Sequence, residues 1–205
     1  MLEPLLSGIT FGLALALMVG PVFFALIQTS LHEGFRAGSF FATGVFISDA
    51  SLIALGYLFA GQLDLLNTHR DLLGWIGGGV LIAFGIFQMT RQPKPKEVDD
   101  NRRTVHGHYI VRGFLMNTLN PMVLLFWLSV IGIVSLRDHY TASDRLTFFG
   151  SVLGTVLCTD LLKSYGAGKL KRLLSAKVMK WINRITGLIV AGFGVEMILR
   201  AFYKS

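Results

Sequence analysis

Long apolar runs separated by short polar stretches dominate the hydrophobic pattern of this chain. About 20 mostly apolar residues are needed to cross a bilayer core, and six runs reach or approach that length. We therefore predict an all-α polytopic membrane protein with six transmembrane helices at residues 5–27, 37–60, 72–90, 113–135, 146–165 and 181–202. The remaining connections are too short for a soluble domain, so any function lies within the membrane.

The composition agrees with a membrane protein. Of the 205 residues, 53% are hydrophobic and only 15% are charged, against about 25% charged in a soluble domain. The net charge of +7 comes from basic residues clustered between the apolar runs, which argues against a nucleic-acid partner. The single cysteine, Cys158, excludes an intramolecular disulfide. The apolar N-terminus has no basic region before it, and we expect a retained first helix rather than a signal peptide.

The basic residues predict the orientation, because Lys and Arg in short loops stay on the cytoplasmic side. Loops 28–36, 91–112 and 163–180 hold 13 of the 19 Lys and Arg residues. The N-terminus, loops 61–71 and 136–145 and the C-terminal end hold 5. We predict that both termini are outside the cytoplasm. If the fifth segment were only re-entrant, the C-terminus would instead be cytoplasmic.

An internal repeat divides the chain into residues 1–90 and 113–205, joined by a charged, proline-bearing cytoplasmic linker, 91–112. The third and sixth segments align without gaps, since Ile76, Gly78, Phe84 and Gly85 recur as Ile185, Gly187, Phe193 and Gly194. Three spans per repeat is an odd number, so the second repeat is upside down relative to the first. Inverted repeats with broken helices are a common plan of secondary transporters.

Proline marks equivalent positions in the first and fourth segments, Gly20-Pro21 and Asn120-Pro121. Proline removes a backbone donor and breaks a helix, and freed backbone groups at membrane depth line cavities or meet other protein groups. Equivalent breaks require the fourth helix to begin early, near Val105. We predict a substrate-binding group that suits a zwitterion: Gly20, Pro21, Asn117, Asn120 and Pro121. Plain proline kinks without a ligand are the alternative.

Two aspartates, Asp49 and Asp160, lie in apolar runs of the second and fifth segments, 111 residues apart. A carboxylate within the membrane is costly and is usually functional, so both are candidates for carrying a proton or holding a substrate amine. Asp49 has no basic residue within a helical turn, and its alternative role is a structural hydrogen bond to Ser, Thr or Asn. For Asp160, an ion pair with Lys163 three residues later is the alternative.

Other chemistry has little support in the sequence. His106 and His108 lie in a charged loop without cysteine or clustered carboxylates, which is weak evidence for a metal. Nucleotide-binding loops and hydrolase motifs are missing from the sequence, so we expect neither an enzyme nor a cofactor. The glycines at small-xxx-small spacing favour close helix packing, and a homodimer contact is equally compatible with them.

Two segments, GPVFFALIQTSLHEGFRAGSFFATGVFISDASL and GFLMNTLNPMVLLFWL, resemble the hallmarks of the lysine-exporter family of translocators, LysE or RhtB. The family's Pro-Gly-Pro, Gly-x-x-x-Gly, Gly-Asp and Asn-Pro motifs correspond to Val19-Gly20-Pro21, Gly34 to Gly38, Ser48-Asp49 and Asn120-Pro121. Val19 and Ser48 depart from the family pattern. The resemblance implies an inner-membrane exporter of amino acids or related metabolites, driven by the proton gradient.

Three hypotheses follow from the sequence. The first is an amino-acid exporter that works by alternating access, with lipid and a small-molecule substrate as its partners. The second is a metal-ion exporter of the same superfamily, which would need several carboxylate, His or Cys ligands at one cavity. The third is a non-transporting membrane scaffold held together by its glycine faces, in which Asp49 and the prolines pack only against protein.

Overall fold

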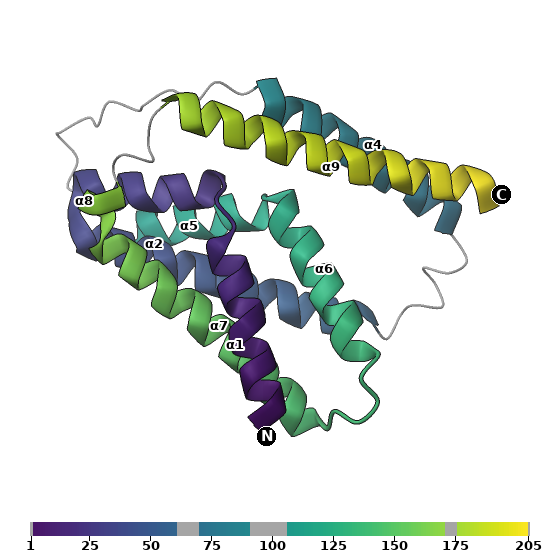
Figure 1. The fold of residues 1–205 in the computed structure, drawn as a ribbon, viewed down its shortest axis with the longest axis horizontal. Helices are drawn as coiled ribbons and strands as arrows, with labels where there is room; N and C mark the ends of the chain where they lie inside the picture. The colour runs from purple at the N-terminus through teal and green to yellow at the C-terminus, as the bar shows by residue number, and fades with distance from the viewer. Residues whose placement is uncertain (1, 61–69, 91–105, 171–175, 205) are drawn as a thin grey trace. The chain divides into compact units, whose positions relative to one another are not determined.

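The computed structural model describes residues 2–60, 70–90, 106–170 and 176–204, which are almost entirely helical and contain no strand (Figure 1). The helices are α1 (Leu2–Leu17), α2 (Pro21–Ala60), α4 (Arg70–Thr90), α5 (His106–Thr118), α6 (Pro121–Ser135), α7 (Ala142–Tyr165), α8 (Ala167–Leu170) and α9 (Ala176–Lys204). The predicted all-α class is confirmed over these residues. Most of loop 61–71 and of linker 91–112 lies outside them.

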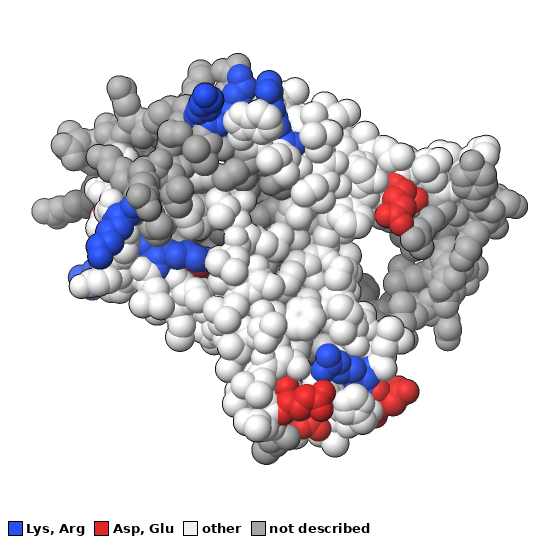
Figure 2. Space-filling model, in the orientation of Figure 1, with Lys and Arg blue, Asp and Glu red and all other residues white. Residues whose placement is uncertain are grey.

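Two of the described helices are long and apolar enough to cross a membrane, Pro21–Leu58 and Ala142–Tyr165. A third span results if α5 and α6 are counted as one bent helix. Large apolar side chains on these helices are exposed, including Leu58, Leu128 and Leu162, as expected of surfaces that contact lipid. On the face drawn in Figure 2, charged side chains of the described residues occupy a few small patches separated by uncharged surface. The chain is an integral membrane protein.

The structure divides into two compact units. Unit 1 comprises residues 1–54 and 96–174, and unit 2 comprises residues 55–95 and 175–205. Each unit therefore combines segments from both halves of the sequence. All of the predicted site residues belong to unit 1.

In unit 2, α4 and α9 pack side by side and antiparallel through pairs of glycines (Figure 1). A methyl group at Gly78 would lie 2.6 Å from the carbonyl oxygen of Gly194, and one at Gly85 would lie 2.6 Å from that of Gly187. No side-chain carbon approaches a backbone oxygen so closely, so the contact requires glycine on both helices. The small-residue packing expected of these glycines is confirmed.

In unit 1, α1 packs along α7, and the two helices run in the same direction (Figure 1). Methyl groups at Gly8 and Gly12 would lie 2.4 Å and 2.9 Å from the carbonyl oxygens of Phe148 and Val152. The fully buried side chains of this unit include an aromatic from each of α2, α6 and α7: Phe41, Trp127 and Phe148.

The structure corrects the predicted connection at 28–36, which is helical on both sides of Gly34. Gly34 has φ 85° and ψ 170°, a backbone conformation that glycine adopts readily and other residues avoid. This one residue separates residues 21–33 from 35–60 within α2. At about 1.5 Å per residue, the second part alone is long enough to cross a bilayer core.

The start of the fourth helix at residue 113 is also corrected, because α5 begins at His106. The earlier start near Val105, which the repeat required, is confirmed. α5 and α6 differ in direction by 67°, so the helix is broken where Asn120-Pro121 predicted a break. Residues 106–112 belong to this helix and not to a linker.

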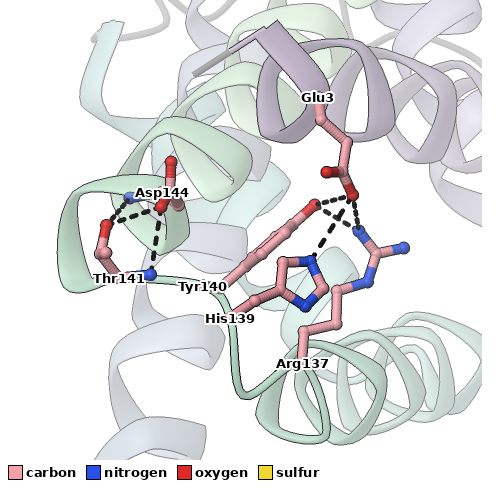
Figure 3. A network of polar contacts seen from close by, with 6 residues as sticks. All are labelled: Glu3, Arg137, His139, Tyr140, Thr141 and Asp144. Atoms are coloured by element: carbon pink, nitrogen blue, oxygen red, sulfur yellow. Dashed lines mark hydrogen bonds and ion pairs between the residues drawn. The ribbon is translucent and has the colours of Figure 1, made fainter.

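At one end of unit 1, the start of α1 contacts the connection between α6 and α7 (Figure 3). Glu3 Oε1 accepts a hydrogen bond of 3.4 Å from the Tyr140 hydroxyl and lies 3.5 Å from Arg137 Nη1. It also lies 3.8 Å from His139 Nε2, and Arg137 donates to the Tyr140 hydroxyl. These contacts hold the N-terminus and the α6–α7 connection at the same end.

The first turn of α7 is stabilised by a capping box (Figure 3). Thr141 Oγ1 accepts a hydrogen bond from the backbone N–H of Asp144, and the Asp144 carboxylate accepts one from the backbone N–H of Thr141. Two backbone donors that a helix start leaves unpaired are satisfied in this way. The α6–α7 connection therefore ends in a well-defined helix start.

The other end of α7 lies near the Gly34 kink. The Phe35 and Tyr165 rings are 6.1 Å apart between centroids, and the Phe40 and His106 rings are 4.6 Å apart. The kink, the end of α7 and the start of α5 therefore meet at one end. These are the described parts of the segments in which the sequence concentrates Lys and Arg.

Candidate functional site

The break between α5 and α6 is built by Asn120 and Pro121. Asn120 is the N-cap of α6, and its Oδ1 accepts a hydrogen bond of 3.2 Å from the backbone N–H of Met122. Pro121 occupies the first helical position, where its missing N–H has no helical partner to lose. The Asn120 amide, predicted to bind substrate, therefore stabilises the helix start with its oxygen.

The break between α1 and α2 is built by Gly20 and Pro21. α1 ends at Leu17 and α2 begins at Pro21, and the Gly20 carbonyl oxygen accepts a hydrogen bond of 3.1 Å from the Phe24 N–H. A methyl group at Gly20 would meet no heavy atom within 4 Å. The predicted break is therefore present, and there is open space beside Gly20.

Asp49 links α2 to both sides of the α5–α6 break. Its side chain is 1% exposed, and its Oδ1 accepts hydrogen bonds from Asn117 Nδ2 at 2.7 Å and from Trp127 Nε1 at 2.8 Å. Hydrogen bonds to a charged group contribute about 1.5–3 kcal/mol each. Neutral donors thus stabilise this carboxylate without cancelling its charge.

Hydroxyl groups extend the Asp49 network on the same helices. Ser48 and Thr118 share a hydrogen bond of 2.7 Å between their hydroxyls, and Asn117 Nδ2 also donates to Ser48 Oγ at 3.1 Å. Ser48 is the position at which the sequence departs from the family's Gly-Asp motif. Its hydroxyl adds a polar contact that glycine lacks.

Two glycines bring α2 and α5 close enough for this network. A methyl group at Gly44 would lie 2.1 Å from the carbonyl oxygen of Ile110, and one at Gly113 would lie 2.2 Å from that of Phe41. Asn117 follows Gly113 by four residues, about one turn along the same helix face. The close backbone contact therefore determines the distance between Asn117 and Asp49.

Asp160 forms the ion pair with Lys163 that its spacing predicted. Lys163 Nζ lies 2.8 Å from Asp160 Oδ1, with the two side chains 18% and 10% exposed. The same ammonium lies 5.8 Å from the centre of the Phe23 ring, in the first turn of α2.

The predicted site residues therefore fall into two groups within unit 1. Asp49, Asn117, Asn120 and Pro121 gather at the α5–α6 break, whereas Asp160 and Lys163 lie beside the turn that follows Gly20 and Pro21. Trp127 was not predicted. An indole N–H within an apolar run needs a buried partner, which is the signal that points to it.

A metal site has no support in the described part of the chain, which holds no group of three or more His, Cys, Asp and Glu side chains able to bind an ion. His106 and His108 are both exposed at the start of α5. The His106 ring contacts the Phe40 ring edge to face.

Comparison with known proteins identifies the family. The family model of the LysE type translocators matches residues 13–201. The threonine efflux protein of Salmonella typhi is 25% identical over 195 residues, which cover 88% of this chain and 90% of the relative. The lysine exporter LysE of Corynebacterium efficiens is 24% identical over 231 residues, with 97% and 99% covered.

A third relative also aligns over most of its length. An uncharacterized membrane protein of Escherichia coli is 26% identical over 185 residues, covering 87% of this chain and 82% of the relative. No solved structure is significantly similar to the chain. The family match extends over nearly the whole sequence and includes both helix breaks and both buried aspartates. This chain therefore belongs to the family of LysE type translocators.

Proposed function

We propose that the protein is a secondary transporter that exports amino acids across the inner membrane. The observation that carries this proposal is the buried Asp49 carboxylate, which accepts two neutral hydrogen bonds across a broken helix. Both donors bind Oδ1, and Oδ2 has no hydrogen-bond partner among the described residues. An intramembrane carboxylate with one free oxygen is suited to bind a proton or a substrate ammonium group.

The names of the relatives support this substrate class. Two relatives that align over nearly their whole length are named a threonine efflux protein and a lysine exporter. The family is one of translocators and not of enzymes. Because the sequence identities are 24–25%, the relatives support amino acids as a class without selecting one amino acid.

We further propose that residues 1–90 and the segment from α5 onward are inverted repeats. In such a repeat, a contact between the two halves has an equivalent in which each half takes the other's place. Two contacts are related in this way: Gly12 packs on the Val152 carbonyl, and Gly113 packs on the Phe41 carbonyl. Gly113 follows Gly12 by 101 residues, one more than the 100 residues between Pro21 and Pro121, and Val152 follows Phe41 by 111, as Asp160 follows Asp49. The glycine pairs of α4 and α9 exchange in the same way. At an offset of 109 residues, Gly187 is the repeat equivalent of Gly78, and Gly194 is that of Gly85. The contact between Gly78 and Gly194 therefore corresponds to the contact between Gly187 and Gly85.

The proposed topology places both termini in the periplasm. It requires the N-terminus and the α6–α7 connection on one side, and residues 28–36, the start of α5 and the end of α7 on the other. The contact between Glu3 and Tyr140 at one end of unit 1 supports this grouping. The contact between Phe35 and Tyr165 at the other end supports it as well.

In the proposed cycle, the two helix breaks line the substrate path and move during alternating access. Pro21 and Pro121 start helices whose N-termini carry partial positive charge, which suits the substrate carboxylate. In this cycle, Asp49 carries the proton whose entry is exchanged for export of the amino acid. Gly20, Asn117 and Asn120 complete the lining of the path.

The proposal is tested by uptake of labelled L-threonine and L-lysine into inverted membrane vesicles, with and without an acidic interior. We expect saturable uptake of at least one of them, stimulated by the acidic interior, and loss of that stimulation in Asp49→Asn. The matched control is Asp138→Asn, at an exposed carboxylate of the α6–α7 connection. Unchanged stimulation in Asp49→Asn would remove Asp49 from the mechanism. Uptake of a divalent metal but of no amino acid would replace the proposed function.

A further inference from the structure

The ion pair of Asp160 and Lys163 is buried, although two residues three positions apart on one helix can also pair on an exposed face. Both side chains are more than four-fifths buried, although they belong to the same helix and could extend toward solvent. Taking two charges out of water is expensive, and apolar replacements of buried ion pairs are often equally stable. Stability is therefore a poor reason for keeping two charges at this position.

The ion pair uses only part of its hydrogen-bonding capacity. A lysine ammonium has three donors, and within the described ranges Lys163 donates one hydrogen bond, to Asp160 Oδ1. Oδ2 of Asp160 accepts no hydrogen bond from the residues that the structure describes. One negative and one positive group, each with unused capacity, therefore lie next to each other.

The position of Lys163 adds a second observation. Its ammonium faces Phe23, in the first turn of α2, and this turn directly follows the break at Gly20 and Pro21. The space beside Gly20 is open, since a methyl group there would meet no atom within 4 Å. The ion pair thus lies beside the helix break at Gly20 and Pro21, where the backbone is not covered by a neighbouring side chain.

We infer that the Asp160–Lys163 pair recognises the two charged ends of a zwitterionic amino acid, with the substrate ammonium on Asp160 and the substrate carboxylate on Lys163. A zwitterion inserted between them replaces one ion pair by two and leaves the net charge unchanged. An analogue that lacks one of the two charges leaves one buried group unpaired, which is strongly unfavourable. This inference rests on the proposed export of amino acids and assigns the site that selects them.

The test measures how well analogues compete with labelled L-threonine for uptake into inverted vesicles. L-Threonine amide lacks the carboxylate, and N-acetyl-L-threonine lacks the ammonium group. In the wild type, we expect each analogue to compete at least tenfold more weakly than unlabelled L-threonine. In Lys163→Met, the penalty for the amide disappears, whereas in Asp160→Asn the penalty for the N-acetyl compound disappears. If L-lysine is the transported substrate, its amide and Nα-acetyl derivatives are used.

Additional variants separate recognition from a structural role. Asp160→Asn combined with Lys163→Met leaves no unpaired charge, so it remains folded even if a single variant is not recovered as a monodisperse protein. We expect this double variant to lose both penalties and to show a raised KM. Lys163→Arg, which keeps the charge, retains the penalty for the amide. Lys169→Met, at an exposed lysine of α8, behaves as the wild type.

A double variant with wild-type KM and wild-type penalties would overturn the inference, because the pair would then be only structural. Single variants that fold and keep the wild-type penalties would overturn it as well. Absence of any amino-acid uptake by the wild type would instead contradict the proposed function, so the two failures are distinguishable.

Discussion

Substitution of Gly113 by alanine tests whether close backbone packing builds the Asp49 network. The added methyl would lie 2.2 Å from the carbonyl oxygen of Phe41, whereas a comfortable carbon–oxygen contact is about 3.3 Å or more. α2 and α5 must therefore separate by about 1 Å at this point. Asn117 lies one turn further along α5, so its hydrogen bond to Asp49 would lengthen from 2.7 Å to about 3.7 Å, beyond the useful range.

The energetic effect of Gly113→Ala combines two opposing contributions. Overpacking of a tight contact costs about 1–3 kcal/mol, and alanine gains about 1 kcal/mol over glycine in a helix. A net loss of up to about 2 kcal/mol lowers the Tm by a few degrees, at about 2–4 °C per kcal/mol. We also expect a loss of uptake that the small drop in Tm does not account for, because Asn117 moves away from the Asp49 carboxylate.

The matched control is Gly132→Ala in α6, where a methyl group would meet nothing within 4 Å. This variant gains helix propensity without strain, so we expect an equal or higher Tm and normal uptake. Both variants are compared with the wild type by thermal unfolding in detergent and by amino-acid uptake into inverted vesicles. If Gly113→Ala matched Gly132→Ala in both measurements, the reasoning from backbone contact to the Asp49 network would be refuted.

Three further substitutions test single features of the site. Trp127→Phe keeps a ring but removes one donor to Asp49. We expect a lower uptake rate in vesicles and an almost unchanged amount of the protein in the membrane. Wild-type uptake would show that the indole N–H is dispensable. Gly20→Ala meets no steric obstacle, so its Tm in detergent stays unchanged, whereas uptake falls if the open space is part of the substrate path; normal uptake would place the path elsewhere. Gly34→Ala forces an L-residue into a backbone region that only glycine adopts readily, which costs about 1–3 kcal/mol, so we expect a lower Tm. An unchanged Tm would mean that the kink relaxes at no cost.

The helix breaks were predictable because their causes are local. Pro21 and Pro121 interrupt helices wherever they occur in an apolar run, and the repeat allowed the position of one break to predict the start of the other helix near Val105. The connection at 28–36 was predicted wrongly because its polar residues resemble a loop. A single glycine at positive φ bends the chain sharply there while the helix continues on both sides.

The partners of Asp49 were only partly predictable. A carboxylate in an apolar run signals a need for partners, and Asn117 was already a candidate as a polar residue near the second break. Trp127 lies 78 residues away in sequence and meets Asp49 only because α5 and α6 differ in direction by 67°. No pattern along the chain encodes that angle, so the contact required the structure.

The proposed repeat explains why the two buried aspartates have different partners. In that proposed repeat, Asp49 and Asp160 are equivalent positions, yet Asp49 accepts hydrogen bonds from neutral side chains, whereas Asp160 pairs with a cation. The repeat equivalents of the two Asp49 donors, taken 100 residues earlier, are apolar and offer no hydrogen bond: Leu17 and Ile27.

A buried carboxylate without neutral donors needs a charged partner, and Lys163 supplies it from the next helical turn. The equivalent of Lys163 in the first repeat is Leu52, so Asp49 has no such partner on its own helix. Asp160 is thus balanced by a cation on its own helix, whereas the side chains that donate hydrogen bonds to Asp49 are neutral. This difference agrees with the roles that we propose, proton exchange at Asp49 and recognition of both substrate charges by Asp160 with Lys163.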